Sequence, residues 1–369
     1  MRLSLILSAI FVLSCLSTYY LLSNSHQDLL NPAGQSPLGG ATATPTPDPL
    51  RPITLLILGY AGANHDGGYL TDTVILAHLN PRTLQLHLIS LPRDLWITLP
   101  LSPQGYPAKI NHAYAIGRDD QKYPAKPEAF TGQSGGLSLA KVVVSQVTGL
   151  PVDYALAVNF DGFRRIINLL GGLAIDVPYA FTDPWYPVAG HEQDTCGFTP
   201  EDVATLSAAL KGEALEHQFP CRFETLHFDA GRQTLDADQA LKFVRSRHAL
   251  NGGGDFGRGL RQQALLKSLQ ASLIRPANLG KLPQLFTTVI QHLQTDIPLL
   301  ALPDLLALPF KPQDLNVASL TLDQANLFRQ TVSQDGQYIL VPANDSGFTA
   351  IQAYLKTALT ANPSPIKKN

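Results

Sequence analysis

The chain has 369 residues, of which 45% are apolar, and its formal net charge is −2 at pH 7. This length is sufficient for one large domain or two ordinary ones. The near-neutral charge excludes a generally basic surface, so nucleic acid is not an expected partner, because binding it would require many more Lys and Arg residues.

The first segment is an uncharged apolar run at residues 3–22, long enough to cross a bilayer as a helix. Arg2 precedes it and the next Lys or Arg is Arg51, so the positive-inside rule places the N-terminus in the cytoplasm and the remainder outside. We therefore predict a cytoplasmic tip and a transmembrane signal-anchor at residues 1–22, in a single-pass protein of the cell membrane. A cleaved signal peptide is the alternative, because its apolar core looks similar.

Residues 23–50 are rich in Pro, Gly, Thr, Ser and Ala and show no apolar periodicity. Such a segment buries too little surface to fold alone. It is predicted to be a disordered linker that holds the folded part away from the membrane. A flexible tail is expected at residues 359–369.

Strands and helices are predicted to alternate between these two segments. Buried strands are expected at 53–59, 72–80 and 85–94, with a hairpin turn at 80–83. Further elements follow in chain order: a helix at 137–150, a strand at 154–160, a helix at 160–172, a strand at 174–178, helices at 236–248 and from about 258 to 274, and strand-like runs at 317–322 and 337–342. Residues 179–230 are expected to be irregular, with one helical stretch. This order predicts an α/β fold, an αβα sandwich with a central mixed β-sheet, in one domain spanning 51–358.

The three cysteines divide between the anchor and the irregular region. Cys15 lies in the anchor, in a stretch that loosely resembles a lipobox, so lipidation is a second alternative there. Cys196 and Cys221 are free to oxidise if the chain is outside the cytoplasm, and a disulfide between them would stabilise the fold by roughly 3 kcal/mol. Two unrelated buried thiols, or a zinc site with nearby histidines, remain alternatives to this predicted disulfide.

Polar residues of two neighbouring strands are expected to meet at one end of the sheet. Asp72 lies at the start of one predicted strand, and Arg93 and Asp94 lie at the end of the next. Because a β-hairpin pairs the start of one strand with the end of its partner, these residues should be neighbours. Two carboxylates with phosphate oxygens are an ordinary Mg²⁺ environment. The alternative is a strand cap and a surface ion pair.

The densest cluster of cations flanks a Gly-rich loop. It comprises Arg245, Arg247, Arg258 and Arg261. Arginine is the side chain best suited to bidentate recognition of phosphate oxygens, and Arg258, Arg261 and Gln262 should share one helical face. The cluster predicts a site for a doubly charged or larger phosphate. Arg245 and Arg247 are also explained as cations favoured at a helix C-terminus.

Two loops carry further candidate residues. Lys109 and Asn111 lie in one of them and could contact a substrate, although a satisfied loop network explains them equally well. His65 and Asp66 follow the first strand, at the end where α/β sheets usually bind ligands.

The order of these motifs resembles the LytR–CpsA–Psr family. The motifs are LILG, LTDT, SLPRD, KINHAYA, VNFDGF, LLGGLAIDVP, ALKFVRSRH and DFGRGLRQQ, and they cover nearly all of residues 53–275. The resemblance implies a membrane-anchored extracytoplasmic phosphotransferase that moves a glycopolymer from a polyprenyl-pyrophosphate carrier to a wall acceptor such as peptidoglycan. It also implies Mg²⁺, with Mn²⁺ as a substitute, arginines around the pyrophosphate, and an apolar tunnel for the polyprenyl tail. The expected partners are this lipid-linked donor, the wall acceptor and the membrane.

Carried over residue by residue, the resemblance gives the clustered side chains their expected roles. The expected catalytic residues are Arg93, Asp94, Arg245 and Arg247. The expected pyrophosphate ligands are Arg93, Arg245, Arg247, Arg258, Arg261 and Gln262, to which we add Lys109. The expected metal ligands are Asp72, Asp94 and Asp66.

The sequence departs from the family pattern at two places. Many members have an acidic residue two positions after the Gly that ends the first strand, where this chain has Ala61. Asp66, in a longer Gly-rich loop, is expected to supply the missing carboxylate. The stretch that contains Cys196 and Cys221 is not part of the basic pattern.

Two other functions are compatible with the same motifs. A hydrolase of the lipid pyrophosphate would use water as the acceptor. A non-catalytic protein that binds lipid or wall would leave the pyrophosphate intact, and the replacement at Ala61 is the feature that supports it.

Overall fold

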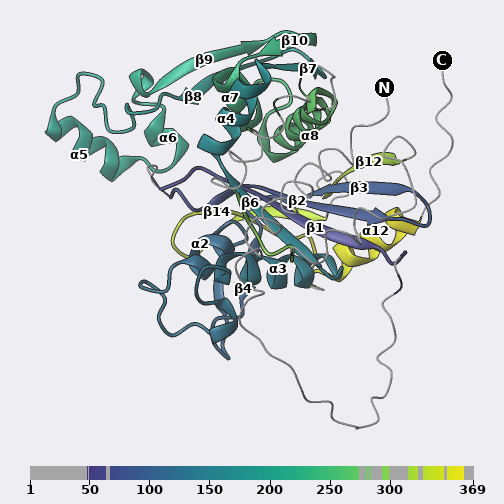
Figure 1. Ribbon diagram of the computed structural model, residues 1–369. Coiled ribbons are helices and arrows are strands. Elements are labelled where there is room, and N and C mark those ends of the chain that lie inside the picture. The colour runs from purple at the N-terminus through teal and green to yellow at the C-terminus, as the bar shows by residue number, and fades with distance from the viewer. Residues whose placement is uncertain are drawn as a thin grey trace, which may run out of the picture.

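A mixed β-sheet lies at the centre of the chain (Figure 1). The computed structural model describes residues 48, 50–63, 67–273, 278, 281, 284, 293–298, 315–322, 327–344 and 347–360. Within these residues the sheet has six strands in the order β11-β6-β1-β2-β3-β12. They are β1 (Ile53–Tyr60), β2 (Thr71–Asn80), β3 (Gln85–Ser90), β6 (Tyr154–Asn159), β11 (Leu293–Thr295) and β12 (Asn316–Thr321). β1, β2 and β3 pair antiparallel, whereas β6 and β12 join in parallel, so the predicted central mixed sheet is confirmed.

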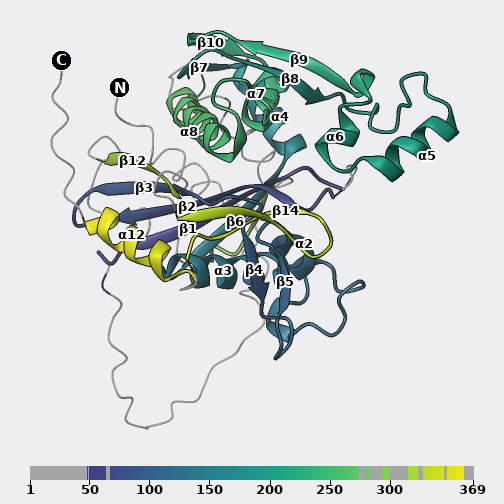
Figure 2. The same cartoon turned by 180° about the vertical axis from the view of Figure 1, so that it is seen from behind.

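Helices lie on both sides of this sheet, as Figures 1 and 2 show. One side carries α2 (His112–Arg118), α3 (Gly135–Thr148) and α12 (Thr349–Thr360), and the other carries α4 (Phe160–Leu170), α7 (Ala237–Arg245) and α8 (Gly254–Leu273). Two strand pairs lie beyond α4, α7 and α8: β7 (Leu173–Val177) with β10 (Gly231–Leu235), and β8 (Phe181–Pro187) with β9 (Phe223–Phe228). The remaining strands are β4 (Trp96–Leu99), β5 (Tyr106–Lys109), β13 (Phe328–Val332) and β14 (Tyr338–Pro342).

Two apolar cores hold these layers together. The first fills the space between the sheet and α3, with buried Leu56, Ile89 and Val143 among its members. The second lies among α7, α8 and the outer strands, and includes Phe243 and Leu173. Each fully buried aliphatic or Phe side chain contributes roughly 1.5–3 kcal/mol relative to an exposed one.

The ends of α7 follow from the sequence on either side of it. Asp236 and Gln239 form a reciprocal capping box at its start, which satisfies two backbone donors. The helix ends at Arg245, three residues earlier than the predicted 248, because Ser246 adopts an extended conformation. The residues after Arg245 are therefore presented as a loop.

The prediction of irregular structure at 179–230 was wrong in part. This stretch contains β8, β9, α5 (Pro200–Ala209) and α6 (Glu213–Glu216). Pro184 and Pro187 interrupt the strand pattern of β8, and its register shifts between Asp183 and Tyr186. Prolines and bulges are tolerated on such edge strands but hide the alternation by which a strand is recognised.

The N-terminal predictions fall outside the described residues. The anchor at 1–22 and nearly all of the linker at 23–50 belong to this group, as does the tail from 361. None of the helices in the described part of the chain is both long and apolar enough to span a membrane.

A buried histidine pair in the sheet should make the stability of the fold sensitive to acid. His78 on β2 lies opposite His87 on β3, and their exposed fractions are 9% and 5%. Burial lowers the pKa of both rings; for His78 the neighbouring His87 lowers it further, whereas Asp153 raises it. Below the ordinary histidine pKa of about 6.5, the unfolded chain therefore binds more protons than the folded chain. The stability due to the neutral pair is complete above that pH and is lost as the pH falls.

We expect the free energy of unfolding, measured by urea denaturation, to fall by up to about 1 kcal/mol per histidine for each pH unit below about 6. The double variant His78→Gln/His87→Gln should show a shallower pH dependence over the same range. His227→Gln, at an exposed position of β9, is the matched control and should keep the wild-type slope. Equal slopes in the wild type and the double variant would contradict this explanation.

Candidate active site

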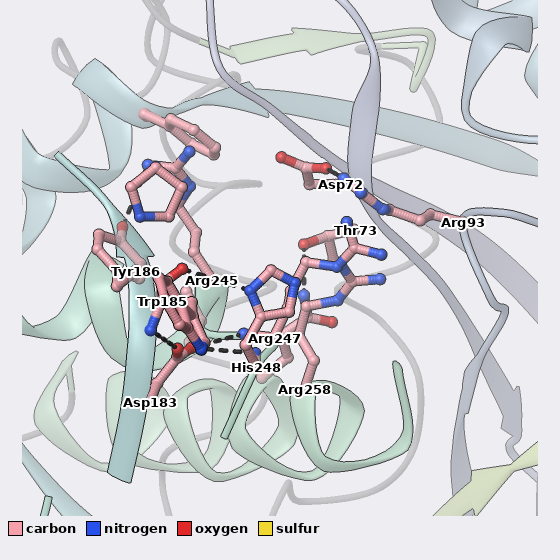
Figure 3. Close-up of a pocket in the computed structure, with 14 residues that line it drawn as sticks. Asp72, Thr73, Arg93, Asp183, Trp185, Tyr186, Arg245, Arg247, His248 and Arg258 are labelled. Atoms are coloured by element: carbon pink, nitrogen blue, oxygen red, sulfur yellow. Dashed lines mark hydrogen bonds and ion pairs between the residues drawn. The ribbon is translucent and has the colours of Figure 1, made fainter. Parts of the chain in front are cut away.

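A cavity of about 240 Å³ brings together segments that are far apart in the sequence. Its lining residues come from β2, the segment after β3, the start of α4, β8, the end of α7 and the start of α8. They are Asp72, Thr73, Arg93, Phe160, Asp183, Trp185, Tyr186, Pro187, Val244, Arg245, Arg247, His248, Arg258 and Gln262. Figure 3 shows the β2 and β3 side of the cavity facing the β8 side, with arginines between them.

The β2 side of the cavity is built as the hairpin predicts. Nη1 of Arg93 donates to Oδ1 of Asp72. The backbone of Asn111 links the two segments, because its carbonyl accepts from the Thr71 N–H and its N–H donates to the Arg93 carbonyl. Asn111 thus positions the ion pair through its main chain, which favours the loop-network explanation of this residue.

Asp94 is buried beside the cavity and is engaged by three cations. It is 2% exposed and does not line the cavity. Its Oδ1 accepts from Nζ of Lys109 at 2.8 Å, and its Oδ2 lies 3.2 Å from Nη2 of Arg247 and 3.4 Å from Nε of Arg93. A buried carboxylate needs such partners, so Asp94 orients three cations from below the cavity. These contacts favour a positioning role for Asp94, and its role as a metal ligand stays a prediction.

Lys109 is likewise engaged in this network. Its ammonium group pairs with Asp94, and the residue is absent from the lining of the cavity. Its position on β5 directs the side chain to the buried carboxylate, which favours a positioning role, and the predicted pyrophosphate contact of Lys109 stays a prediction.

The Arg-Ser-Arg-His segment after α7 is fixed by a second buried carboxylate, Asp183. Its Oδ2 accepts from Oγ of Ser246 at 2.7 Å and from the backbone N–H groups of Arg247 and His248 at 3.0 and 3.1 Å. Its Oδ1 accepts from the backbone N–H of Trp185. These charge-assisted hydrogen bonds are stronger than neutral ones, so Asp183 holds the loop in the shape that presents its arginines.

Arg245 is held against aromatic rings. Its guanidinium carbon lies 4.7 Å from the ring centroid of Phe160 and 5.9 Å from that of Tyr186. Nη1 donates to the Tyr186 hydroxyl at 3.3 Å. Burial raises the pKa of Tyr186, although Arg245 opposes the shift. The phenol therefore stays protonated at neutral pH, and the planar guanidinium is fixed by stacking.

Two arginines of α8 have different environments. Arg258 lines the cavity, whereas Arg261 does not and is completely buried. Arg261 donates Nε to the Phe243 carbonyl at 3.0 Å, Nη1 to the Gly252 carbonyl at 2.8 Å and Nη2 to the Ser246 carbonyl. In the structure the guanidinium of Arg261 supports the loop that carries Arg247, and its predicted contact with pyrophosphate stays a prediction.

Gln262 and Asp66 complete the predicted set. Gln262 lines the cavity and donates Nε2 to Oγ1 of Thr73 at 2.8 Å, which ties α8 to β2. Asp66 lies outside the described residues, as does His65, and a metal-binding role for Asp66 stays a prediction.

Several cavity residues were missed in the sequence. Asp183, Trp185, Tyr186 and Pro187 all come from β8, which the sequence did not predict as a strand. The available signal was the pattern F-T-D-P-W-Y-P, in which an acid and two aromatic residues lie close together. His248 was visible as the residue after the Arg-Ser-Arg motif.

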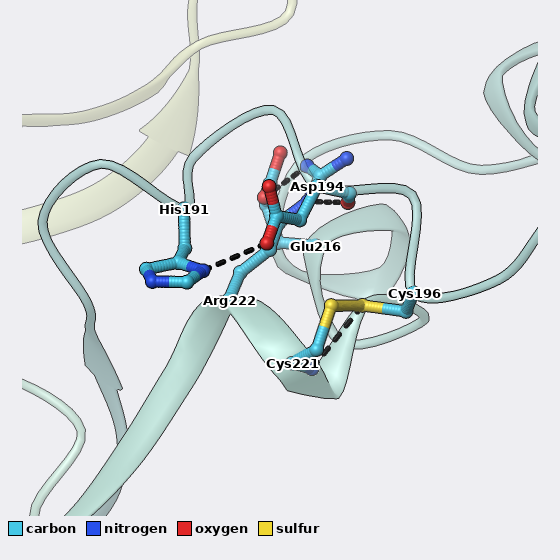
Figure 4. The surroundings of a disulfide bond; sticks show 6 residues. All are labelled: His191, Asp194, Cys196, Glu216, Cys221 and Arg222. Carbon is cyan, nitrogen blue, oxygen red and sulfur yellow. Dashed lines mark hydrogen bonds and ion pairs between the residues drawn. A yellow bond between two sulfur atoms is a disulfide. The ribbon is translucent and has the colours of Figure 1, made fainter.

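The structure places the sulfur atoms of Cys196 and Cys221 at bonding distance, with the two Cα atoms 5.6 Å apart. Figure 4 shows Arg222 beside this pair. Nε of Arg222 donates to the Asp194 carbonyl at 2.7 Å, and Nη1 lies 3.3 Å from Glu216. The predicted disulfide is thus geometrically feasible, and its oxidation in the native protein stays a prediction.

The charges of the site favour a polyanion. Among the residues that the structure describes, four arginines and two carboxylates line the cavity: Arg93, Arg245, Arg247 and Arg258, with Asp72 and Asp183. Arg247 lies 153 positions from Asp94, to which it is paired, so the fold brings the two arginine groups together. The structure is therefore an α/β protein with an arginine-lined cavity at the start of β2, suited to a multiply charged phosphate.

The comparisons with known proteins give this class its family. The chain belongs to the LytR_cpsA_psr family, which matches residues 22–352. The resemblance seen in the motifs is confirmed.

Two curated relatives illustrate the similarity. The chain is 24% identical over 249 residues to the polyisoprenyl-teichoic acid–peptidoglycan teichoic acid transferase TagU of Enterococcus faecalis, covering 67% of this chain and 62% of that protein. It is 24% identical over 250 residues to the transferase of the same description named TagV in Bacillus subtilis, covering 67% of this chain and 50% of that protein. The matched region thus spans about half to three fifths of these relatives.

Solved structures share the fold. The crystal structure of B. subtilis TagV matches with a TM-score of 0.52 and 22% identity, covering 85% of this chain and 99% of that one. Protein gbs0355 from Streptococcus agalactiae matches with a TM-score of 0.55 and 21% identity, covering 85% and 90%.

Proposed function

We propose that this protein is a phosphotransferase that moves a glycopolymer from a polyprenyl-pyrophosphate carrier to a cell-wall acceptor such as peptidoglycan. The observation that carries this proposal is the convergence of four arginines on one cavity. Pyrophosphate is a compact polyanion whose oxygens match the fork of arginine. The family, and the names of the relatives as teichoic acid transferases, support the same reaction class.

The proposed step is a displacement at phosphorus. An acceptor hydroxyl oxygen bonds to the phosphorus that carries the glycopolymer, and the bond from that phosphorus to the bridging oxygen breaks. Polyprenyl phosphate leaves with the electron pair, and the hydroxyl proton is released to solvent. Negative charge grows on the bridging oxygen, where fixed guanidinium groups stabilise it without reorganising. Arg245 and Arg247 are suited to this task, because Tyr186 and Asp94 hold them in place.

A divalent cation, Mg²⁺ or Mn²⁺, fits the same site. Oδ1 of Asp72 pairs with Arg93, and its Oδ2 has no hydrogen bond among the described residues, so it is available as a hard oxygen ligand. The described residues contain no group of three His, Cys, Asp or Glu side chains able to hold a metal. Asp72 would hold the ion together with the substrate phosphates and the predicted ligand Asp66, and the bound ion would neutralise part of the phosphate charge.

The proposed transferase activity predicts that the acceptor accelerates the release of polyprenyl phosphate. Purified protein should release lipid phosphate slowly from a polyprenyl-pyrophosphoryl glycan, and at least roughly tenfold faster when soluble peptidoglycan fragments are added, because the acceptor replaces water as the attacking group. Radiolabelled glycan should then appear on the fragments. A release rate that is unaffected by the fragments would favour the hydrolase, and intact bound lipid would favour a binding protein.

Replacing Asp72 with Asn should reduce lipid-phosphate release by roughly two to three orders of magnitude. The amide keeps the size of the side chain but removes the anion that holds Arg93 and the proposed cation. Asp176→Asn, at an exposed position of β7, is the control and should leave the rate unchanged. Full wild-type activity in the presence of EDTA would contradict the metal part of the proposal, and full activity of Asp72→Asn would contradict the role of Asp72.

We also propose that residues 1–22 anchor the protein in the cell membrane with the cavity on the extracytoplasmic side. The uncharged run at 3–22 and the late first cation of the exterior segment, Arg51, support this orientation. An extracytoplasmic site has no ready supply of ATP, which agrees with the use of an already activated lipid-linked donor.

A further inference from the structure

The stretch at residues 188–222, here called the insertion, is closed at its base. It leaves β8 and returns to β9, and the backbone N–H of Val188 donates to the Arg222 carbonyl at 2.9 Å. The Cys196–Cys221 pair joins its two arms, and Arg222 binds both the Asp194 carbonyl and Glu216 (Figure 4). These contacts link the two arms of the insertion, so it can hold its side chains in fixed positions.

Two residues at the end of the insertion reach the wall of the cavity. The ring of His217 stacks on Trp185 with centroids 3.9 Å apart and an interplanar angle of 17°. Nε2 of His248 lies 3.2 Å from Oε1 of Glu213, and its Nδ1 lies 3.3 Å from the Trp185 carbonyl. Both Trp185 and His248 line the cavity, so the insertion contributes directly to its rim.

This part of the rim combines a flat aromatic surface with polar groups. Phe223 meets Trp185 edge-on at 5.4 Å, which together with His217 fixes the indole ring from two sides. Glu213 is 73% exposed at its side chain and His248 is 32% exposed. A pyranose ring packs its C–H face on such an aromatic surface, while a carboxylate and an imidazole meet its hydroxyl groups. An isoprenoid chain has no hydroxyl groups and would therefore form no hydrogen bond with the Glu213 carboxylate or the His248 imidazole.

The position of this rim agrees with a ligand that extends from the phosphate. Trp185 lies on the β8 side, across the cavity from Asp72, with arginines between the two sides (Figure 3). A sugar joined to a phosphate bound at those arginines would reach the β8 side directly.

We propose that Trp185, backed by His217 and flanked by Glu213 and His248, forms a carbohydrate subsite that holds the sugar ring nearest the phosphate. This subsite proposal rests on the proposed function, and it specifies that the insertion recognises the sugar part of the substrate. The sugar has two available sources, the donor glycopolymer and the wall acceptor, and the experiment below separates them.

Binding would be measured with three soluble probes and the full-length protein in detergent. The first probe is farnesyl pyrophosphate, the second is the same lipid carrying one N-acetylglucosamine, and the third is an oligomer of the peptidoglycan disaccharide added at saturating farnesyl pyrophosphate. The variants are Trp185→Leu, which removes the flat ring, and Glu213→Gln, which is at an exposed position and should not affect folding. Phe198→Leu is the matched control, because Phe198 is an aromatic residue of the insertion that contacts Phe219 instead of the cavity.

We expect Trp185→Leu to weaken the binding of one of the two sugar-bearing probes by on the order of tenfold. Glu213→Gln should weaken the binding of the same probe by a few fold, and Phe198→Leu should leave the binding of both unchanged. A loss confined to the glycosylated lipid identifies the donor sugar, and a loss confined to the oligomer identifies the acceptor sugar. The subsite is overturned, and the proposed function is left intact, if the variants bind both sugar-bearing probes as tightly as the wild type does. The same conclusion follows if Trp185→Leu weakens the binding of farnesyl pyrophosphate, which carries no sugar, as much as that of the sugar-bearing probes. Failure of the wild type to bind farnesyl pyrophosphate overturns both.

Discussion

Arg245→Ala should lower the rate of lipid-phosphate release by roughly two to three orders of magnitude at saturating donor. The guanidinium is fixed between the Phe160 and Tyr186 rings and bonded to the Tyr186 hydroxyl. It therefore faces the charge that develops on the leaving phosphate without any reorganisation. Because the interaction strengthens as the bond breaks, the loss should appear in kcat more than in KM.

Arg245→Lys tests whether geometry or charge is responsible. Lysine keeps the charge but lacks the planar fork and stacks poorly on aromatic rings, so it should recover only a small part of the activity. Arg165→Ala, at an exposed position of α4, is the control and should retain the wild-type rate. Wild-type activity of Arg245→Lys would show that the position requires only a positive charge, and wild-type activity of Arg245→Ala would exclude Arg245 from the reaction.

The central sheet and one side of the site could be predicted from local sequence patterns. The hairpin turn after Asn80 fixes the register of β2 and β3, and continuing this register brings Asp72 to Arg93. Local sequence patterns could not predict that Arg93 and Arg247 lie close together, because their proximity depends on how α7 and α8 pack over the sheet. The family resemblance supplied that link.

The β8 side of the site could not be predicted from local sequence patterns. β8 carries two prolines and a register shift, so its alternation is hidden, and its residues were not recognised as part of a strand. Helical spacing correctly places Arg258 and Arg261 near one another. The spacing does not show that Arg258 lines the cavity whereas Arg261 is covered by the loop after α7. This difference depends on how α8 packs against that loop.

The same ambiguity applies to acidic residues. Asp94 looks like a metal ligand in the sequence, because it follows a candidate phosphate-binding arginine, whereas Asp183 was not recognised as a site residue at all. In the structure each has both oxygens engaged, Asp94 by side-chain cations and Asp183 mainly by backbone N–H groups. Their partners lie far away in sequence, so the sequence does not reveal that these carboxylates are structural.

Arg261→Met should produce the largest loss of stability, roughly 3–5 kcal/mol in the free energy of unfolding. Methionine fills a similar volume but donates no hydrogen bond. The carbonyls of Phe243, Ser246 and Gly252 would then lose their charged donor inside the fold, and each unsatisfied buried carbonyl is costly. The guanidinium also lies 4.6 Å from the Phe181 ring centroid, a contact that methionine would replace only in part.

Urea denaturation would measure this loss, with Arg165→Met as the control, which should change the unfolding free energy by no more than about 0.5 kcal/mol. Burial lowers the pKa of Arg261, although Tyr179 and Asp183 oppose this shift, and arginine keeps its charge in proteins. Stability should therefore not depend on the titration of Arg261 near neutral pH. If Arg261→Met unfolds at the wild-type urea concentration yet loses activity, Arg261 acts on the substrate and not on the loop, and the structural role inferred from its burial is wrong.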